Sequence, residues 1–341
     1  MWNFSWLKKV ALAVGLSSAL CACGCRCQGQ PFDGQPPVRT PAGATTAEPS
    51  VVGREGARKP ITVQELKGAM TKLTPLHERI HKPGPGDWLS EHAEPGQTFA
   101  EYLTEDPVTP DLEPGKGKRH KLAIQPLGPL TDTQRKLVAL TSQTMEAFFG
   151  LPVETKSDLP LSVIPNHARR THPSWGVEQI LSTYILDGVL KPRLPDDAAA
   201  YISFTAIDLW PGKGWNFVFG QASLRARVGV WSIYRNGDPD QSEESFRLAL
   251  LRTIKTAVHE TGHMFSMRHC TAYECVMCGS NNREESDRRP VWLCPECVAK
   301  ISWATQTSLA VRYERLLKLA EDQGFDEEAT QFRRSIHALQ R

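Results

Sequence analysis

Residues 259–278 read HETGHMFSMRHCTAYECVMC, and CPEC follows at 294–297. The stretch from His259 to Cys297 holds three of the ten histidines and five of the nine cysteines. Residues four apart lie on one face of an α-helix, so His259 and His263 can present both imidazoles to a single ion, with Glu260 beside them. This spacing predicts the site of a zinc hydrolase.

His269 is the candidate for a third ligand. A catalytic zinc usually binds three side chains and one water, so two helical histidines leave it one ligand short. His269 is too distant for the same helical face, but it comes within reach if the helix ends near Phe265 and the chain turns back. Zinc lowers the pKa of its bound water to about 7, and Glu260 would accept the proton. The predicted reaction is hydrolysis of a peptide bond.

Two close-spaced cysteine pairs predict a second, structural zinc site. They are Cys270 with Cys275 and Cys294 with Cys297. Buried free thiols and two disulfides are the alternatives. Because His269 and Cys270 are adjacent, the second ion would anchor the segment that supplies the third ligand of the first. The expected cofactor is zinc, two ions per chain, and we interpret Cys278 as a thiol outside this set.

The run H-E-x-x-H-x-x-x-x-x-H-C-x-x-x-x-C-x-M, followed by C-x-x-C, resembles the signature of the archaemetzincins, a branch of the metzincin zinc peptidases. The connecting segment 279–297, GSNNREESDRRPVWLCPEC, resembles the eukaryotic-type members. The resemblance covers about residues 250–300 and is weaker back to about residue 80.

The resemblance implies a role for each residue of the motif. It implies that the catalytic zinc is bound by His259, His263 and His269, with Glu260 as general base. It implies that the structural zinc is bound by the following cysteines: Cys270, Cys275, Cys294 and Cys297. Met277 would form the Met-turn beneath the catalytic metal. An exposed edge strand at about 217–224 would pair antiparallel with an extended substrate.

Ser266 departs from the family pattern, which has glycine three residues after the second histidine. Glycine suits the left-handed turn that ends the zinc helix, and a serine there costs on the order of 1 kcal/mol. The resemblance therefore predicts a positive φ at Ser266.

The N-terminus predicts export. Lys8 and Lys9 precede an apolar run at 10–20, which is typical of a signal peptide over residues 1–23. The ending Leu20-Cys21-Ala22-Cys23 resembles a bacterial lipobox, which would make Cys23 a lipidated residue. The alternatives for the cysteines at this end are metal binding or disulfides; these cysteines are Cys21, Cys23, Cys25 and Cys27. We expect a membrane-tethered lipoprotein on the periplasmic or cell-surface side, held through this anchor alone.

The remaining chain divides into four predicted parts. Residues 24–60, rich in Pro, Gly, Ala and Thr, form a disordered linker. Residues 61–118 form an N-terminal extension without an assigned role beyond packing. Residues 119–320 form the metallopeptidase domain, and residues 321–341 a C-terminal helix. Hydrophobic periodicity predicts strands at 121–127, 161–165, 200–208, 217–224 and 228–234, and helices at 63–80, 132–149, 177–186, 242–265, 298–319 and 327–339.

This order predicts an α/β (α+β) fold with a mixed, partly parallel twisted sheet, a zinc-binding helix and a zinc-stapled C-terminal subdomain. The net charge of the 341 residues is +2, and the basic residues are not gathered in a stripe, so no nucleic-acid partner is expected. We expect a monomer that acts on a peptide or protein. A catalytically silent zinc-binding interaction module is the alternative, and the presence of Glu260 argues against it.

Overall fold

A six-stranded mixed sheet organises the computed structural model, which describes residues 20–23, 60–111, 119–223 and 226–341. Its strands, in spatial order, are β1 (Leu20–Cys23), β8 (Gly220–Ser223), β9 (Val228–Ser232), β6 (Ala198–Thr205), β2 (Lys121–Leu127) and β3 (Val153–Thr155). The four strands from β9 to β3 are parallel to one another, whereas β8 is antiparallel to both of its neighbours. The predicted mixed α/β architecture is confirmed.

Strand β6 lies at the centre of the sheet because its sequence is apolar on both faces. All eight of its residues are buried, which is typical of a parallel strand covered on both sides. Ile202 and Phe204 face one core and Tyr201 faces the other. A second sheet is built from β4 (Arg169–Thr171), β5 (Glu178–Leu181) and β7 (Asp208–Trp210).

Two long helices pack against each other and, together with the sheet, enclose the larger core. Helix α5 (Asp132–Phe149) begins at a capping box in which Thr131 and Gln134 bond each other's backbone, and it ends at Gly150 with φ 64°. Helix α7 (Glu243–Met264) is capped by Ser242 and carries the zinc motif. Both follow the predicted bounds closely because caps and periodicity are local signals.

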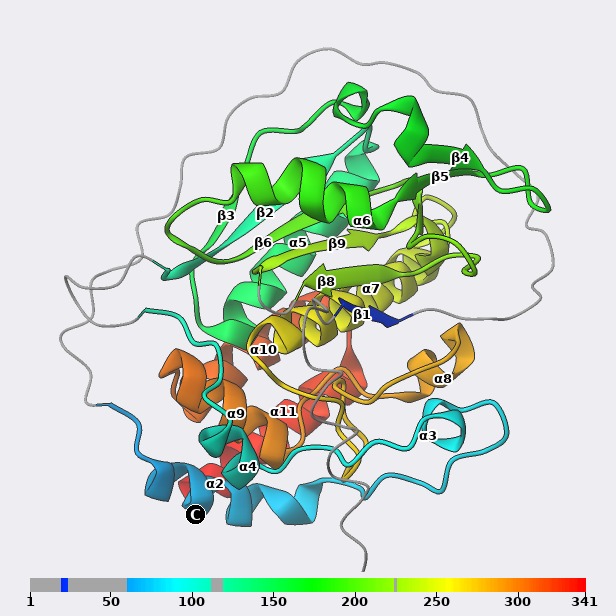
Figure 1. Cartoon of the computed structure of the whole chain (residues 1–341). Helices are drawn as coiled ribbons and strands as arrows, with labels where there is room; N and C mark the ends of the chain where they lie inside the picture. The colour runs from blue at the N-terminus through cyan, green and yellow to red at the C-terminus, as the bar shows by residue number, and fades with distance from the viewer. Residues whose placement is uncertain (1–19, 24–59, 112–118, 224–225) are drawn as a thin grey trace, which may run out of the picture.

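The N-terminal extension and the C-terminal helices lie together in the lower half of Figure 1. The N-terminal extension contains α2 (Val63–Leu73), α3 (Trp88–Glu91) and α4 (Phe99–Thr104). It packs against α9 (Pro295–Thr305) and α11 (Asp326–Gln340), and α11 packs on α10 (Leu309–Gln323). The short α8 (Arg283–Arg288) lies beside α3. No helix among the described residues is long and apolar enough to span a bilayer.

Four predicted elements differ from the structure. The helix expected at 63–80 ends at Leu73 and is followed by a 3₁₀ turn, Thr74–Leu76, because Arg79 is extended and pairs with the distant Tyr273. The strand expected at 161–165 is a 3₁₀ turn, Leu161–Val163, because prolines at both ends remove ladder donors; β3 supplies the strand instead. The helix expected at 177–186 opens as β5, which pairs with the distant β7, and continues as α6 (Ser182–Tyr184) and a π-helix, Ile185–Leu190. The single helix expected at 298–319 is divided into α9 and α10 at Gln306, which has φ 51°.

Strand β8 is not the exposed edge that the resemblance implied. The backbone of Leu20–Cys23 pairs antiparallel with it, so β1 occupies the outer position. These four residues are the only described part of the predicted signal peptide, and residues 24–59 of the predicted linker lie outside the described residues. The short turns of the remaining chain are Thr74–Leu76, Asn166–Ala168, Lys191–Arg193 and Tyr234–Asn236.

Candidate metal centre

Helix α7 brings His259 and His263 to one point. Their Nε2 atoms lie 3.0 Å apart, as the four-residue spacing predicts. Met277 packs directly against this turn of the helix, because a Cβ built on Gly262 would lie 2.6 Å from the Met277 Sδ. The glycine inside the motif is therefore needed for this close packing, and Met277 lies against the turn that carries the two histidines.

The chain reverses after α7 and returns His269 to the same point. Phe265 caps the helix, Ser266 has φ 62°, and the Met267 amide donates to the Gly262 carbonyl at 3.1 Å. The predicted positive φ at Ser266 is confirmed. The ring centroid of His269 lies 5.2 Å from that of His259 and 5.0 Å from that of His263.

Each of the three imidazoles donates through Nδ1 to an acceptor of the chain. His259 donates to the Val276 carbonyl at 2.8 Å and His263 to the Met267 carbonyl at 2.6 Å. His269 donates to the Glu94 carboxylate at 2.8 Å. A carbonyl can only accept, so Nδ1 carries the proton and Nε2 is left with its lone pair. Each tautomer is thus the one that a metal requires.

The environment of the three rings fits a metal ion. One ligand atom from each ring lies within 4.8 Å of the others, and the rings are buried. Burial lowers the pKa of His259 to about 3 and the pKa of His263 well below its usual value, so both rings are neutral. The buried Nε2 of His269 has no hydrogen-bond partner, and a metal would satisfy it.

Glu260 is a buried carboxylate without a hydrogen-bond partner on either oxygen. It is 1% exposed, and burial raises its pKa to about 8. Such a group is costly unless charge and donors are supplied from outside the chain. A cation with its water would supply both at this position, one residue from His259.

Four cysteine sulfurs form a second cluster next to the first. Cys270, Cys275, Cys294 and Cys297 are buried, and their sulfurs all lie within 4.8 Å of one another. The Cys270 and Cys294 sulfurs are 3.6 Å apart, close to the separation of about 3.8 Å that bonds of about 2.3 Å impose in a tetrahedron. None of the cysteines with described side chains forms a disulfide. Hydrogen bonds from Cys275 and the other thiols lower the pKa of Cys270, which favours a thiolate.

Cys278 lies beside this cluster but outside the group of four. Its sulfur donates to the Tyr273 carbonyl at 3.2 Å. Hydrogen bonding with Cys270 and burial raise its pKa well above the usual value, so Cys278 is a neutral thiol.

Nothing in the sequence pointed to Glu94 or to the residues around it. Glu94 and His269 are 175 positions apart, and Glu94 belongs to the N-terminal extension. The Trp88 ring, in the same extension, packs edge-on against the His269 ring, and the two ring centroids lie 5.1 Å apart. Gln97 accepts from the Arg268 amide at 3.2 Å and donates to the Ser266 carbonyl at 3.3 Å. The extension therefore braces the turn that presents the third histidine.

The Ser266 side chain explains why serine is tolerated where the family has glycine. Its Oγ accepts a hydrogen bond from the Val108 amide at 3.0 Å, which ties the turn to the extension. Such a bond contributes about 1 kcal/mol, comparable to the cost of a positive φ.

We expect Ser266→Ala to lower the stability of the zinc-loaded protein by about 1 kcal/mol, because it keeps the strained φ and loses the bond to Val108. Ser266→Gly loses the same bond but relieves the strain, so its midpoint should stay close to that of the parent. The melting midpoints of the parent, Ser266→Ala and Ser266→Gly, measured by thermal denaturation, rank the three proteins by stability. A glycine variant less stable than the alanine variant would contradict the left-handed turn, because alanine is favoured over glycine only at ordinary φ.

Comparison with known proteins agrees with this geometry. A model of peptidase family M54 matches residues 201–303. Archaemetzincin-2 of Homo sapiens is 34% identical over 291 residues, which cover 76% of this chain and 79% of that protein. The chain belongs to the archaemetzincin family. As an archaemetzincin it is a zinc metallopeptidase, and the alternative of a silent interaction module is not favoured.

Archaeal archaemetzincins match a shorter part of the chain. The protein of Archaeoglobus fulgidus is 35% identical over 184 residues, which are 54% of this chain and 99% of that protein. A crystal structure of archaemetzincin from Archaeoglobus fulgidus, complexed with malonate, superimposes with a TM-score of 0.42 and 30% identity, covering 53% of this chain and 99% of that one.

Proposed function

We propose that this archaemetzincin binds two zinc ions with separate roles and hydrolyses peptide bonds at the first of them. The observation that carries the proposal is the convergence of three buried imidazoles next to a buried carboxylate that has no hydrogen-bond partner of its own. His259, His263 and His269 would hold the catalytic ion. When bound, zinc supplies a Lewis acid that lowers the pKa of water and polarises a carbonyl.

Glu260 is the general base in this proposal. Its buried carboxylate would accept the proton of the attacking water and pass it to the leaving amine. Burial raises the pKa of Glu260, and the charge of an adjacent zinc ion would lower it again, so that the ionised carboxylate can accept the proton. The four cysteines would hold the structural ion, which anchors Cys270 and therefore its neighbour His269.

A library of peptides tests this function directly. We expect the purified mature chain, which begins at Cys23, to cleave a subset of the library, to lose this activity to a chelator and to regain it with zinc. Mass spectrometry of the products identifies the cleaved bonds. Absence of zinc-dependent cleavage across the library would overturn the proposal.

The substrate would extend the sheet beside β8. An extended peptide gains affinity from main-chain hydrogen bonds to such a strand and selectivity from side-chain pockets. In the full chain β1 takes this position. Cleavage between Ala22 and Cys23, as the lipobox resemblance implies, would remove three of the four β1 residues and open β8 to a substrate.

Glu94 positions His269 in this scheme. Burial opposes ionisation, but the interactions with His269, Trp88 and His92 together lower the pKa of Glu94, so the carboxylate is charged and orients the His269 ring. We expect Glu94→Gln to weaken zinc binding about 10- to 100-fold, measured by competition with a chromophoric chelator. Glu78→Gln, which changes an exposed glutamate of the same extension, is the matched control. Equal zinc affinity in the two variants would exclude this role.

Export and lipid anchoring complete the proposal. The support is the sequence of the N-terminus, with its basic start, apolar run and Cys23. One acyl chain binds a bilayer only marginally, so we expect several chains on the mature N-terminus. Intact mass measurement after expression in a bacterium decides between a lipidated Cys23 and an unmodified chain, and an unmodified N-terminus before residue 20 would exclude the anchor.

A further inference from the structure

A pocket opens beside Glu260 on the side of α7 that faces the segment between the two cysteine pairs. Lys255, Thr256 and His259 line it from the helix, and Asn282 and other residues of the segment 276–290 line it from the opposite side. The pocket is open to solvent. Proposed catalysis at Glu260 uses only one corner of it, so the rest is available to a substrate side chain.

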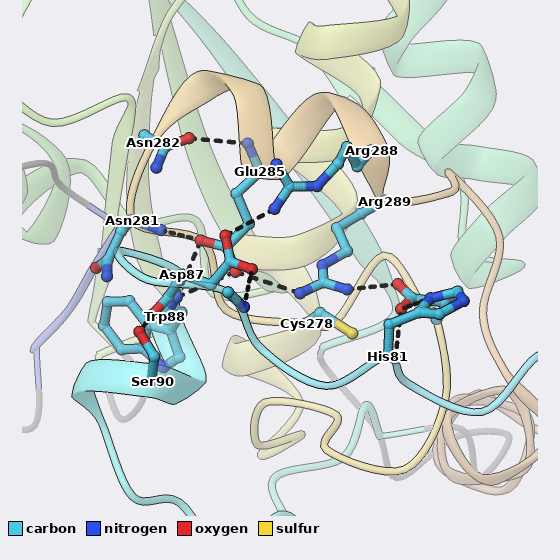
Figure 2. A network of polar contacts seen from close by, with 12 residues as sticks. His81, Asp87, Trp88, Ser90, Cys278, Asn281, Asn282, Glu285, Arg288 and Arg289 are labelled. Atoms are coloured by element: carbon cyan, nitrogen blue, oxygen red, sulfur yellow. Dashed lines mark hydrogen bonds and ion pairs between the residues drawn. The ribbon is translucent and has the colours of Figure 1, made fainter.

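The side chains around the pocket are predominantly basic. Lys255, Arg283 and Arg289 line it, against one acidic residue, Glu260. Arg289 is neutralised by Glu274 and Glu285, which hold its guanidinium within a fixed network (Figure 2). That network also joins α8 to the extension, since Glu285 accepts from the Trp88 amide at 3.0 Å. The wall of the pocket is therefore rigid before a substrate arrives.

Lys255 lies outside this network of ion pairs. It is 7% exposed, and its Nζ donates to the backbone carbonyls of Ser286 and Asp287 at 3.3 and 3.1 Å. No carboxylate oxygen within the described part of the chain forms an ion pair with it, and Asp287 is engaged by Arg252. An ammonium has three donors, so one remains for a ligand. Burial lowers the pKa of Lys255, although the nearby carboxylates of Asp287, Glu328 and Glu327 act in the opposite direction.

The direction of β8 places the pocket relative to the cleaved bond. A Cβ on Gly220 would lie 3.3 Å from the Thr256 Cγ2, and a Cβ on Gly229 would lie 2.5 Å from the Met264 Cε. Gly229 pairs with Ala222, so the Ala222 end of β8 lies toward Met264, whereas Gly220 lies beside Thr256. Strand β8 and helix α7 therefore run in the same direction. A substrate antiparallel to β8 runs the opposite way, and its carboxyl side reaches the start of β8 and the turn of α7 that carries Lys255.

We propose that this pocket binds a carboxylate on the substrate residue that follows the cleaved bond, with Lys255 as the residue that selects it. The proposal rests on the proposed peptidase function. The carboxylate can belong to an aspartate or glutamate side chain or to the free C-terminus of a short substrate. Either would accept a charge-assisted hydrogen bond from the Lys255 ammonium.

Matched peptides test the selectivity with the zinc-loaded mature chain that begins at Cys23, in which β8 is open to a substrate. One amidated series carries Glu, Gln, Leu or Lys after the cleaved bond. A second pair ends at that residue as a free acid or an amide. We expect kcat/KM to favour the carboxylate over its uncharged counterpart about tenfold or more in at least one arm, and that arm identifies the source. Ratios near one in both arms overturn the pocket assignment.

Substitution of Lys255 then tests the residue itself. Lys255→Met should bring the Glu to Gln ratio, or the acid to amide ratio, close to one, and Lys255→Arg should retain it. Lys318→Met, at an exposed lysine of α10, is the matched control and should keep the parent ratio. Zinc content and thermal denaturation verify that each variant is folded. If Lys255→Met fails to fold, Lys255→Gln replaces it, and an unchanged ratio in either variant overturns the role of Lys255.

The two proposals fail in different ways. Cleavage of library peptides without preference for a carboxylate leaves the peptidase function in place and overturns only the pocket assignment. Absence of zinc-dependent cleavage of any peptide overturns the peptidase function, and the pocket assignment with it.

Discussion

Glu260→Gln is expected to lower kcat/KM by about 10²- to 10⁴-fold while zinc content and thermal stability are retained. The carboxamide keeps the size of the side chain but cannot accept a proton from water. His259, His263 and His269 hold their tautomers through Nδ1 bonds that do not involve Glu260, so metal binding should survive. The measurement combines steady-state kinetics on the best library peptide with metal analysis of the same preparation.

The matched control for this variant is Glu284→Gln, which changes an exposed glutamate of α8. It should keep the parent kcat/KM. Substantial activity in Glu260→Gln would exclude Glu260 as the base, whereas loss of zinc in the same variant would show that the carboxylate contributes to binding the metal.

Cys294→Ser is expected to have the largest effect on folding. Structural zinc in small cysteine sites contributes on the order of 10 kcal/mol or more of apparent binding free energy, which is also folding free energy. Removing one of four buried thiolates should therefore release the structural ion and reduce the yield of folded protein. Because Cys270 of the same cluster adjoins His269, the catalytic site should be disturbed as well.

Cys278→Ser provides the matched control, since this cysteine lies close by but outside the group of four. A serine hydroxyl can reproduce the hydrogen bond to the Tyr273 carbonyl. The variant should keep both ions and a parent-like melting midpoint. Loss of zinc in Cys278→Ser would mean that Cys278 is a ligand, and full zinc content in Cys294→Ser would contradict the four-cysteine site.

Short-range signals in the sequence were sufficient for the zinc helix and for the candidate ligands. The caps and periodicity of α5 and α7 are properties of neighbouring residues, and the spacing of His259 and His263 follows from helical geometry alone. The family pattern predicts the positive φ of Ser266, because the glycine that the family has at this position suits a left-handed turn. The central strand β6 was found because its apolar run has no helical period.

Tertiary structure alone decided the features that depend on distant partners. Strand β5 is extended because β7 offers it a ladder, although its sequence suits a helix. The carboxylate that orients His269 comes from Glu94, and the bond that retains Ser266 comes from Val108. In the sequence, nothing distinguishes Lys255 from the other basic residues of the helices. Only its burial against the carbonyls of Ser286 and Asp287 makes it a candidate for substrate selection. Local sequence sets the conformation of a segment, but hydrogen-bond partners, burial and charge balance belong to pairs of segments that only the folded chain brings together.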